Sequence, residues 1–257
     1  MACFMGIDIG SGTSKGVITK DGKLVVYHIL NSGVNYRTVS LKLREELLAE
    51  AGLCVEDITS TVTTGHGVGI IPFSNCHVAD MECCAGGIHC IFPSVRMVID
   101  VQGQSSQVIH LDERGQITGF AVSEVCASGS GYFIEAIANV LQVPLEDIGS
   151  LSLNAKNPVT FTTGCAVFGE SEAISRVAEG VTKEDIIAGV YQALAGKISV
   201  LIDRVGLEEP CAISGGGGLN IGLIKKVEER GIHLLVPSQP QIVNALGAAL
   251  IAGEHDF

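Results

Sequence analysis

The stretch GIDIGSGTSKGVI, from Gly6 to Ile18, decides the fold of this chain. It has the pattern of a buried strand carrying an acidic residue, Asp8, followed by a turn of glycines and hydroxyl residues and then a second strand. A dipeptide typical of a hairpin turn, Asp21-Gly22, comes next. We therefore predict two antiparallel strands joined by a small-residue turn, with a second reversal after them.

A related stretch occurs later in the chain. The segment VIDVQGQSSQVI, from Val98 to Ile109, places Asp100 where the first segment has Asp8, and a turn near Gly115 follows it. Each copy combines a buried strand, an acidic residue, a turn of small or polar residues and a second strand. Self-similarity of this kind indicates that the same structural unit is built twice.

The two turns have the chemistry of phosphate-binding sites. A turn of glycine and hydroxyl residues exposes backbone N–H groups toward an anion, and the nearby Lys15 adds positive charge. An aspartate at a strand end, such as Asp8 or Asp100, can hold Mg²⁺ directly or through water. Two such turns facing each other would bind a polyphosphate from both sides. The alternative is a pair of ordinary hairpins, with Lys15 a solvent-facing strand lysine.

A third glycine turn lies in the segment PCAISGGGGLN, from Pro210 to Asn220. It has the pattern of a short apolar strand, a glycine turn and the start of a helix over residues 219–229. Glycines allow a flat base or a ribose to approach the backbone closely, so this turn could contact a nucleoside. The alternative interpretation of the four glycines is a flexible linker. The stretch 241–252 is rich in small apolar residues and predicts a closely packed helix.

Two cysteines lie in similar settings, Cys126 in EVCASGSGYF and Cys165 in TTGCAVFGESE. We expect each to stand at the start of a helix, where unpaired N–H groups and the helix dipole favour the thiolate. Two thiolates are half of the four ligands that an iron–sulfur cluster takes. A symmetric dimer would supply the other two and make the protein an electron carrier. Glu170 and Glu172 have two interpretations, helix capping or nucleotide sensing.

The remaining cysteines have simpler explanations. A disulfide scaffold does not fit their spacing or the length of 257 residues. Cys83, Cys84 and Cys90 fall in a predicted helix over residues 81–90, so helix packing is favoured over a metal cluster with His77. Cys3, Cys54 and Cys211 are expected to be core or surface thiols.

Composition limits the class of protein. Hydrophobic residues make up 47% of the chain and charged residues 17%, with a net charge of −12 and no basic block. A nucleic-acid partner is therefore not expected. Neither a signal peptide nor an 18-residue apolar run is evident, so we expect a cytoplasmic protein without a membrane partner.

The order of these sites resembles the superfamily of acetate and sugar kinases, heat-shock chaperone ATPases and actin. With the two cysteine segments added, the whole chain resembles the activator ATPases (component A) of 2-hydroxyacyl-CoA dehydratases and the ATPase subunits of benzoyl-CoA reductases. The most specific pieces are the IDIGS opening, CASGSG at 126–131 and CAVFGESE at 165–172.

The resemblance implies an α/β fold with two actin-like (ribonuclease H-like) domains. Each would be a mixed sheet flanked by helices, with the nucleotide in the interdomain cleft. Residues 1–96 would form the first domain, onto which the C-terminal helix 241–257 packs back. Residues 97–257 would form the second, which carries the cluster ligands.

The resemblance also implies cofactors and partners. The chain would be a homodimer with one [4Fe–4S] cluster on its twofold axis, bound by Cys126 and Cys165 of each subunit. It would take an electron from ferredoxin or flavodoxin and pass it, with ATP hydrolysis to ADP, to an acceptor dehydratase or reductase. Asp8 and Asp100 would handle Mg²⁺ and water, with Gln104 as a further catalytic residue. The implied nucleotide-binding residues are Ser11, Gly12, Thr13, Ser14, Lys15, Gln102, Gly103, Gln104, Gly215, Gly216, Gly217 and Gln241.

The chain departs from the family pattern at the second phosphate turn, which usually reads Asp-Ile-Gly-Gly-Gln-Asp. Gln102 replaces the first glycine and Ser105 the later aspartate, which bears on metal handling and hydrolysis. Val125 replaces a lysine that is common before the first cysteine.

Two other functions use the same turns. A sugar-type kinase would need a catalytic base and a substrate pocket, and its cysteines would serve packing. A nucleotide sensor without redox chemistry would bind ATP and turn it over slowly.

Overall fold

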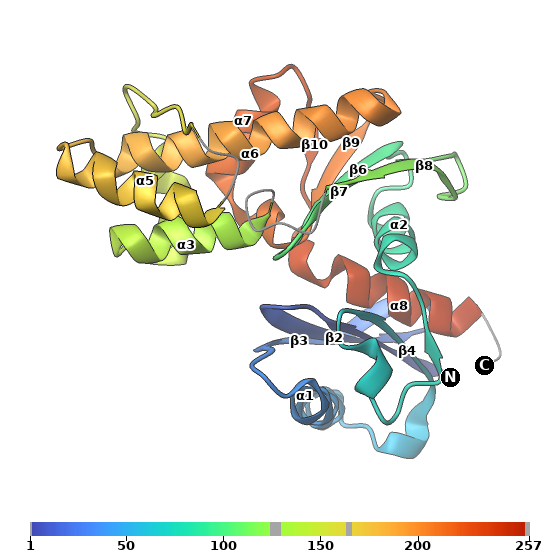
Figure 1. Cartoon of the computed structure of the whole chain (residues 1–257). Helices are drawn as coiled ribbons and strands as arrows, with labels where there is room; N and C mark the ends of the chain where they lie inside the picture. The colour runs from blue at the N-terminus through green and yellow to red at the C-terminus, as the bar shows by residue number, and fades with distance from the viewer. Residues whose placement is uncertain (1, 124–129, 163–165, 255–257) are drawn as a thin grey trace. The chain divides into compact units, whose positions relative to one another are not determined.

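The computed structural model describes residues 2–123, 130–162 and 166–254 of the chain (Figure 1). The chain divides into two compact units. The first comprises Met1–Val95, Leu111–Ile117 and Ser238–Phe257, and the second comprises Arg96–His110 and Thr118–Pro237.

The first sheet has the strand order β3-β2-β1-β4-β5. β1 runs antiparallel to β2 and parallel to β4, and Asp8 of β1 pairs with Lys15 of β2. Asp21 and Gly22 both have positive φ between β2 and β3, which confirms the predicted hairpin reversal. The strands are β1 Cys3–Ile9, β2 Thr13–Lys20, β3 Lys23–Asn31, β4 Ile58–Gly65 and β5 Cys76–His77.

The second sheet has the strand order β10-β9-β6-β7-β8, which is the same topology with β6 in the place of β1. β6 runs antiparallel to β7 and parallel to β9, and Asp100 pairs with Gln107 across the first of these ladders. The predicted repeat is therefore confirmed as two sheets of one topology. The strands are β6 Met97–Val101, β7 Ser106–Leu111, β8 Ile117–Val122, β9 Cys211–Ser214 and β10 Leu234–Leu235.

Close packing of small residues joins α8 to the first sheet and to α2. A Cβ on Gly6 of β1 would collide with the backbone of Ala245 and Ala249 in α8, and one on Gly247 would collide with the carbonyl of Cys83. The predicted small-residue helix is thus confirmed. The helical segments of this unit are α1 Tyr36–Ala51, η1 Val55–Asp57, η2 Val68–Ile70, α2 Asp80–Ile91, η5 Pro240–Ile242 and α8 Val243–Glu254.

The predicted role of the α2 cysteines in packing is confirmed for Cys83 and Cys84 but not for Cys90. Cys83 and Cys84 are fully buried, whereas Cys90 is exposed. Burial raises the pKa of the Cys83 thiol to about 12, so this thiol stays protonated at neutral pH. Among the residues that the structure describes, no three His, Cys, Asp or Glu side chains gather as a metal site.

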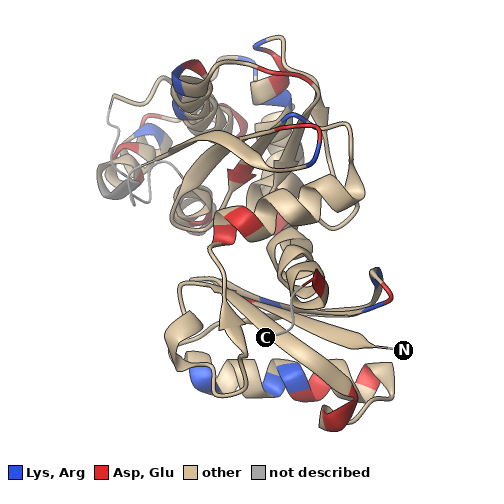
Figure 2. Ribbon diagram, turned by 90° about the vertical axis from the view of Figure 1, so that its right-hand side faces the viewer, with Lys and Arg blue, Asp and Glu red and all other residues tan. Residues whose placement is uncertain are grey.

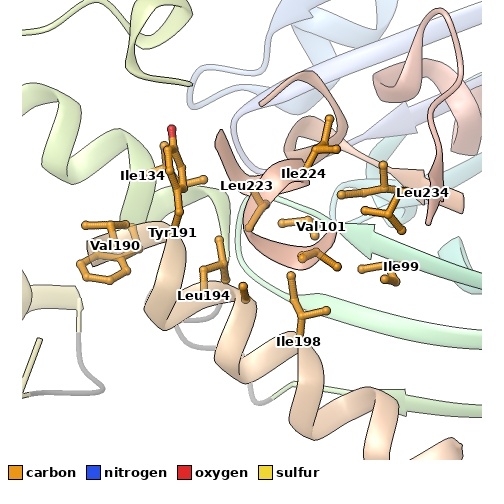
Figure 3. Packing of buried hydrophobic residues seen from close by; sticks show 14 of the residues in the cluster. Ile99, Val101, Ile134, Val190, Tyr191, Leu194, Ile198, Leu223, Ile224 and Leu234 are labelled. Carbon is orange, nitrogen blue, oxygen red and sulfur yellow. The ribbon is translucent and has the colours of Figure 1, made fainter. Parts of the chain in front are cut away.

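The second unit packs its helices around the long apolar helix α6 (Figure 3). Tyr191, Leu194 and Ile198 of α6 are buried in one cluster with Ile99 and Val101 of β6. The predicted strand, glycine turn and helix near residue 215 are confirmed as β9, η4 and α7. The helical segments are α3 Gly131–Leu141, α4 Leu145–Ser152, α5 Ala166–Ala178, α6 Lys183–Val205, η4 Gly216–Leu219 and α7 Ile221–Glu228.

One described helix, α6, is long and apolar enough by length and composition to cross a membrane, and 67% of that apolar stretch is buried inside the structure. Its buried residues belong to the core of the second unit.

Charged residues lie on the outer faces of helices, as α1 illustrates at the bottom of Figure 2. There Lys42 and Glu46 form a surface pair at 3.6 Å.

Candidate functional site

The first phosphate turn connects β1 to β2 and is fixed from the end of β3. The Gly10 N–H donates to the Thr13 carbonyl at 3.2 Å. Ser32 then donates its hydroxyl to the Gly10 carbonyl at 2.6 Å and its N–H to the Gly12 carbonyl at 3.0 Å. Because its carbonyls are bonded inward, the turn keeps Gly12 exposed. Ser32 carries no local sequence signal, since only strand pairing brings it here.

Asp8 and Lys15 form an ion pair beside this turn. Lys15 Nζ lies 3.3 Å from Asp8 Oδ2 and donates to the Thr13 carbonyl at 3.1 Å. Its side chain is only 13% exposed, so the interpretation of Lys15 as a solvent-facing strand lysine is wrong. The hydroxyl of the buried Ser14 lies 2.8 Å from that of Ser32, and this pair supports the turn from below.

The second phosphate turn is built around a buried carboxylate, Asp100. The Gln102 N–H closes the turn by donating to the Ser105 carbonyl at 2.9 Å. Asp100 Oδ2 accepts from Gln102 Nε2 at 2.7 Å and from Gln107 Nε2 at 3.0 Å, and Oδ1 accepts from Ser214 Oγ at 2.9 Å. Gln107 and Ser214 are the neighbours of Asp100 in the sheet register, and only the register identifies them. Gly103 and Gln104 complete the turn and are half-buried.

The third glycine turn packs directly against the end of β6. Gly215 has φ +74°, and a Cβ there would come within 2.7 Å of Asp100 Oδ1. A Cβ on Gly217 would collide with Val101, whereas Gly216 is exposed. The second and third turns therefore meet at Asp100. Gln241, the remaining predicted contact, lies in η5 of the first unit.

The two expected cluster ligands, Cys126 and Cys165, lie outside the described residues, as does Val125. α5 begins at Ala166, directly after Cys165. α3 begins at Gly131, and whether a helix starts at Cys126 lies outside the described residues. Ser130, directly before α3, is extended (φ −148°, ψ 177°).

The start of α3 is anchored on the second phosphate turn. The Gly131 N–H donates to the Gln102 carbonyl at 2.8 Å, and the Tyr132 N–H donates to the Gly103 carbonyl at 3.0 Å. A helix leaves its first N–H groups without partners inside the helix, and here turn carbonyls take two of them. Two hydrogen bonds therefore join the second phosphate turn to the start of α3.

The first turns of α3 and α5 are in contact with each other. A Cβ on Gly169 would lie 2.6 Å from the ring of Phe133, which leaves room only for glycine at this position. Phe161 packs edge-on against Phe133 with ring centroids 5.7 Å apart. The chain on the C-terminal side of both expected ligands thus converges on one place.

Glu172 of α5 ties the chain before Cys165 to the helix after it. The Thr162 N–H donates to Glu172 Oε2 at 3.1 Å and its hydroxyl to the same oxygen at 3.0 Å. Arg176 Nη2 lies 3.6 Å from Glu172 Oε1. The carboxylate therefore ties Thr162 to α5 rather than capping the first turn of its own helix.

A family model, described as the BadF/BadG/BcrA/BcrD ATPase family, matches residues 5–252. The chain belongs to this family. The resemblance to dehydratase activators and benzoyl-CoA reductase ATPase subunits is thereby confirmed for nearly the whole chain.

Two curated relatives have nearly the length of this chain. The chain is 36% identical over 250 residues to the 2-hydroxyisocaproyl-CoA dehydratase activator of Clostridioides difficile, covering 96% of this chain and 94% of the relative. It is 32% identical to a benzoyl-CoA reductase subunit of Thauera aromatica, covering 97% of this chain and 93% of the relative.

Solved structures agree. The Clostridium difficile activator with bound ADPNP superposes with a TM-score of 0.93 at 36% identity, covering 98% of this chain and 94% of that one. Component A of the Acidaminococcus fermentans (R)-2-hydroxyglutaryl-CoA dehydratase has a TM-score of 0.94 at 33% identity, covering 99% and 98%. The predicted fold class of two actin-like domains is confirmed. A ROK family glucokinase of Streptomyces griseus, with a TM-score of 0.61 at 13% identity over 99% of this chain and 100% of that one, shares the fold alone.

Proposed function

We propose that this protein is an ATP-driven one-electron activator of an acyl-CoA dehydratase or a related reductase. It works as a homodimer that holds one [4Fe–4S] cluster. The observation that carries the proposal is the packing of the first turns of α3 and α5, the helices that follow the two cysteines in sequence, through Gly169 and Phe133.

The three glycine turns bind the nucleotide, with Mg²⁺ arriving as part of the substrate. Backbone N–H groups of residues 11–13 and the Lys15 ammonium would hold phosphate oxygens. Gly216, which is exposed beside Asp100, leaves space for ribose or base. Asp8 would place Mg²⁺ or the attacking water. A family member with ADPNP bound supports nucleotide binding by this chain.

Cys126 and Cys165 of each subunit would bind the cluster. The donor chemistry fits, because [4Fe–4S] clusters take four thiolates and two chains supply four. Cys165 directly precedes the N-terminus of α5, whose dipole stabilises a nearby negative charge by about 0.3–1 kcal/mol. When bound, the cluster supplies the one-electron redox chemistry. Glu172 would keep the Cys165 loop in shape through its bonds to Thr162.

ATP binding would affect the cluster region through α3. Its first two N–H groups are bonded to the turn that would contact phosphate, so a shift of that turn displaces the helix. Contact between Gly169 and Phe133 would pass the displacement to α5. Hydrolysis would then reset the turn and release the acceptor enzyme.

The partners follow from the relatives. The acceptor would be a dehydratase or reductase of the kind named for them, and ferredoxin or flavodoxin would supply the electron.

Anaerobic purification tests the proposal. The protein should be brown and contain about two iron atoms per chain, half of a four-iron cluster. Cys126→Ala and Cys165→Ala should each abolish iron binding and leave ADP affinity within about twofold. Cys90→Ala, which removes an exposed thiol of α2, is the matched control and should keep its iron. Iron retained in either ligand variant would contradict the assignment, and a colourless protein that phosphorylates a sugar would favour a kinase.

A further inference from the structure

Asp100 is an unusual carboxylate for a nucleotide site because it is completely enclosed. Its exposed fraction is 0%, and its two oxygens accept three hydrogen bonds. A buried charge is stable only when its lone pairs are used, and here three donors use them. A metal ion that coordinated Asp100 through Oδ2 would first have to displace one of the two amide donors on that oxygen.

The three donors differ in origin. Gln107 and Ser214 are buried residues of β7 and β9 that face Asp100 through the sheet register. Gln102 belongs to the phosphate turn itself, is half-buried, and makes the shortest of the three bonds at 2.7 Å. It is therefore the donor that can change without disturbing the sheet.

The orientation of the Gln102 amide follows from its neighbours. Asp100 can only accept, so the amide must turn its NH₂ group toward the carboxylate. The opposite side, Oε1, then accepts from Ser105 Oγ at 3.4 Å. Gln102 and Ser105 are the two positions at which this turn departs from the family pattern, and the structure connects them to each other and to Asp100.

We propose that Gln102 is a positioning residue that keeps Asp100 as a hydrogen-bond acceptor and so lowers the dependence of nucleotide binding on divalent cation. The inference rests on the proposed nucleotide site. Mg²⁺ demands near-ideal octahedral oxygen ligands and gives up its water reluctantly. A carboxylate oxygen already bonded to two amide groups is a poor competitor for it. Without the Gln102 amide, that oxygen has one donor fewer, and a cation that accompanies the nucleotide becomes the better partner.

The experiment compares ADP affinity, measured by calorimetry, in Mg²⁺ and in EDTA. For the unaltered protein, we expect the two dissociation constants to differ by less than about threefold. We define the ratio as the dissociation constant of ADP in EDTA divided by that in Mg²⁺. For Gln102→Ala this ratio should rise by about tenfold, the equivalent of one hydrogen bond to a charged group. Gln102→Glu, which is isosteric but places a second carboxylate at Asp100, should raise it further and serves if the alanine variant does not fold.

Two further variants separate positioning from general damage. Ser105→Ala should raise the ratio by a smaller factor, and it should have no effect in a Gln102→Ala background, because Ser105 acts only through Gln102. Gln116→Ala, in the exposed turn before β8, is the matched control and should leave the ratio unchanged.

The outcomes distinguish this inference from the proposed function. If the unaltered protein binds no ADP under either condition, the nucleotide site itself is wrong and this inference falls with it. If it binds ADP and the ratio in both Gln102→Ala and Gln102→Glu equals that of the unaltered protein, only the role of Gln102 is overturned.

Discussion

At the residue scale, a glycine lies against each of the two acidic residues. Gly65 at the end of β4 has φ +89°, and a Cβ there would lie 2.5 Å from Asp8 Oδ1. Gly215 after β9 has φ +74° and a corresponding distance of 2.7 Å to Asp100 Oδ1. Since β4 and β9 occupy the same place in the two sheets, the repeat includes this contact as well as the phosphate turns.

Gly65→Ala should therefore impair nucleotide binding. The new methyl group would push Asp8 away from Lys15, and we expect ADP affinity to fall by at least tenfold in calorimetry. Gly22→Ala is the matched control, because Gly22 also has positive φ but has open space around its Cβ position. Gly22→Ala should lose roughly 1 kcal/mol of unfolding free energy from backbone strain. Gly65→Ala should lose more, because its Cβ would also lie 2.5 Å from the Ile9 carbonyl oxygen. Equal ADP affinity in the two variants would show that the contact with Asp8 is unimportant.

The thiols outside the cluster segments should differ in reactivity. Cys90 and Cys54 are exposed, but a hydrogen bond to Asp57 raises the pKa of Cys54 and should slow its alkylation. We expect mass spectrometry after iodoacetamide treatment at pH 8 to find Cys90 modified first, Cys54 later and Cys83 last. Asp57→Asn should accelerate Cys54 alone. Faster modification of Cys83 than of Cys90 would contradict the packing of α2.

Burial of the Cys83 thiol also makes the free energy of unfolding depend on pH. The folded-state pKa of Cys83 is about 12, above the ordinary value of 9.0, so folding favours the protonated thiol. Its contribution is complete below about pH 9 and is lost as pH rises toward 12. Denaturant titrations of Cys83→Ala should show a shallower decline of unfolding free energy across this window than the unaltered protein.

At the element scale, the contact between α3 and α5 is the feature on which the cluster proposal depends. Gly169→Ala should force Phe133 aside and lower the iron content of the anaerobically purified protein by at least half, with ADP affinity unchanged. Alanine is otherwise favoured over glycine inside a helix, so a loss of iron would come from the collision of the new methyl group with the Phe133 ring. Gly196→Ala in α6, whose Cβ would make only an ordinary 3.6 Å contact, is the matched control.

A second-site change completes this test. Phe133→Leu shortens the side chain that Gly169→Ala would meet, so the double variant should recover iron toward the unaltered level. Iron content that is the same in all these variants would mean that the helix contact does not shape the cluster segments.

Sequence alone predicts those parts of the fold and site that are encoded locally. Hairpin turns such as Asp21-Gly22, the glycine turn at Gly215 and the helix of Cys83 follow from short-range patterns. Ser32 and Ser214 could not be predicted, because their roles depend on which strands become neighbours in a sheet. The anchoring of α3 has the same cause, since the N–H groups of its first two residues donate to the carbonyls of the distant Gln102 and Gly103.

At the scale of the whole molecule, the two units share one sheet topology and differ in the connection after the third strand. In the first sheet, α1 and the short η1 connect β3 to β4. In the second, α3 to α6 connect β8 to β9, and both cysteine segments fall in this connection. The proposed redox function would thus be added to one copy of the repeated unit, in the connection whose helix α3 is bonded to the second phosphate turn.

Dimerisation should depend on the cluster. Each chain has a net charge of −12, so two chains repel each other unless shared ligation and packing outweigh the repulsion. Sedimentation should give twice the chain mass of 26.8 kDa for the brown protein, and chelation of the iron should shift the equilibrium toward the single chain. Added salt should strengthen association of the iron-free chains, because it screens like charges. An iron-loaded protein that sediments as a single chain would overturn the shared cluster, since one chain provides only two of the four thiolates.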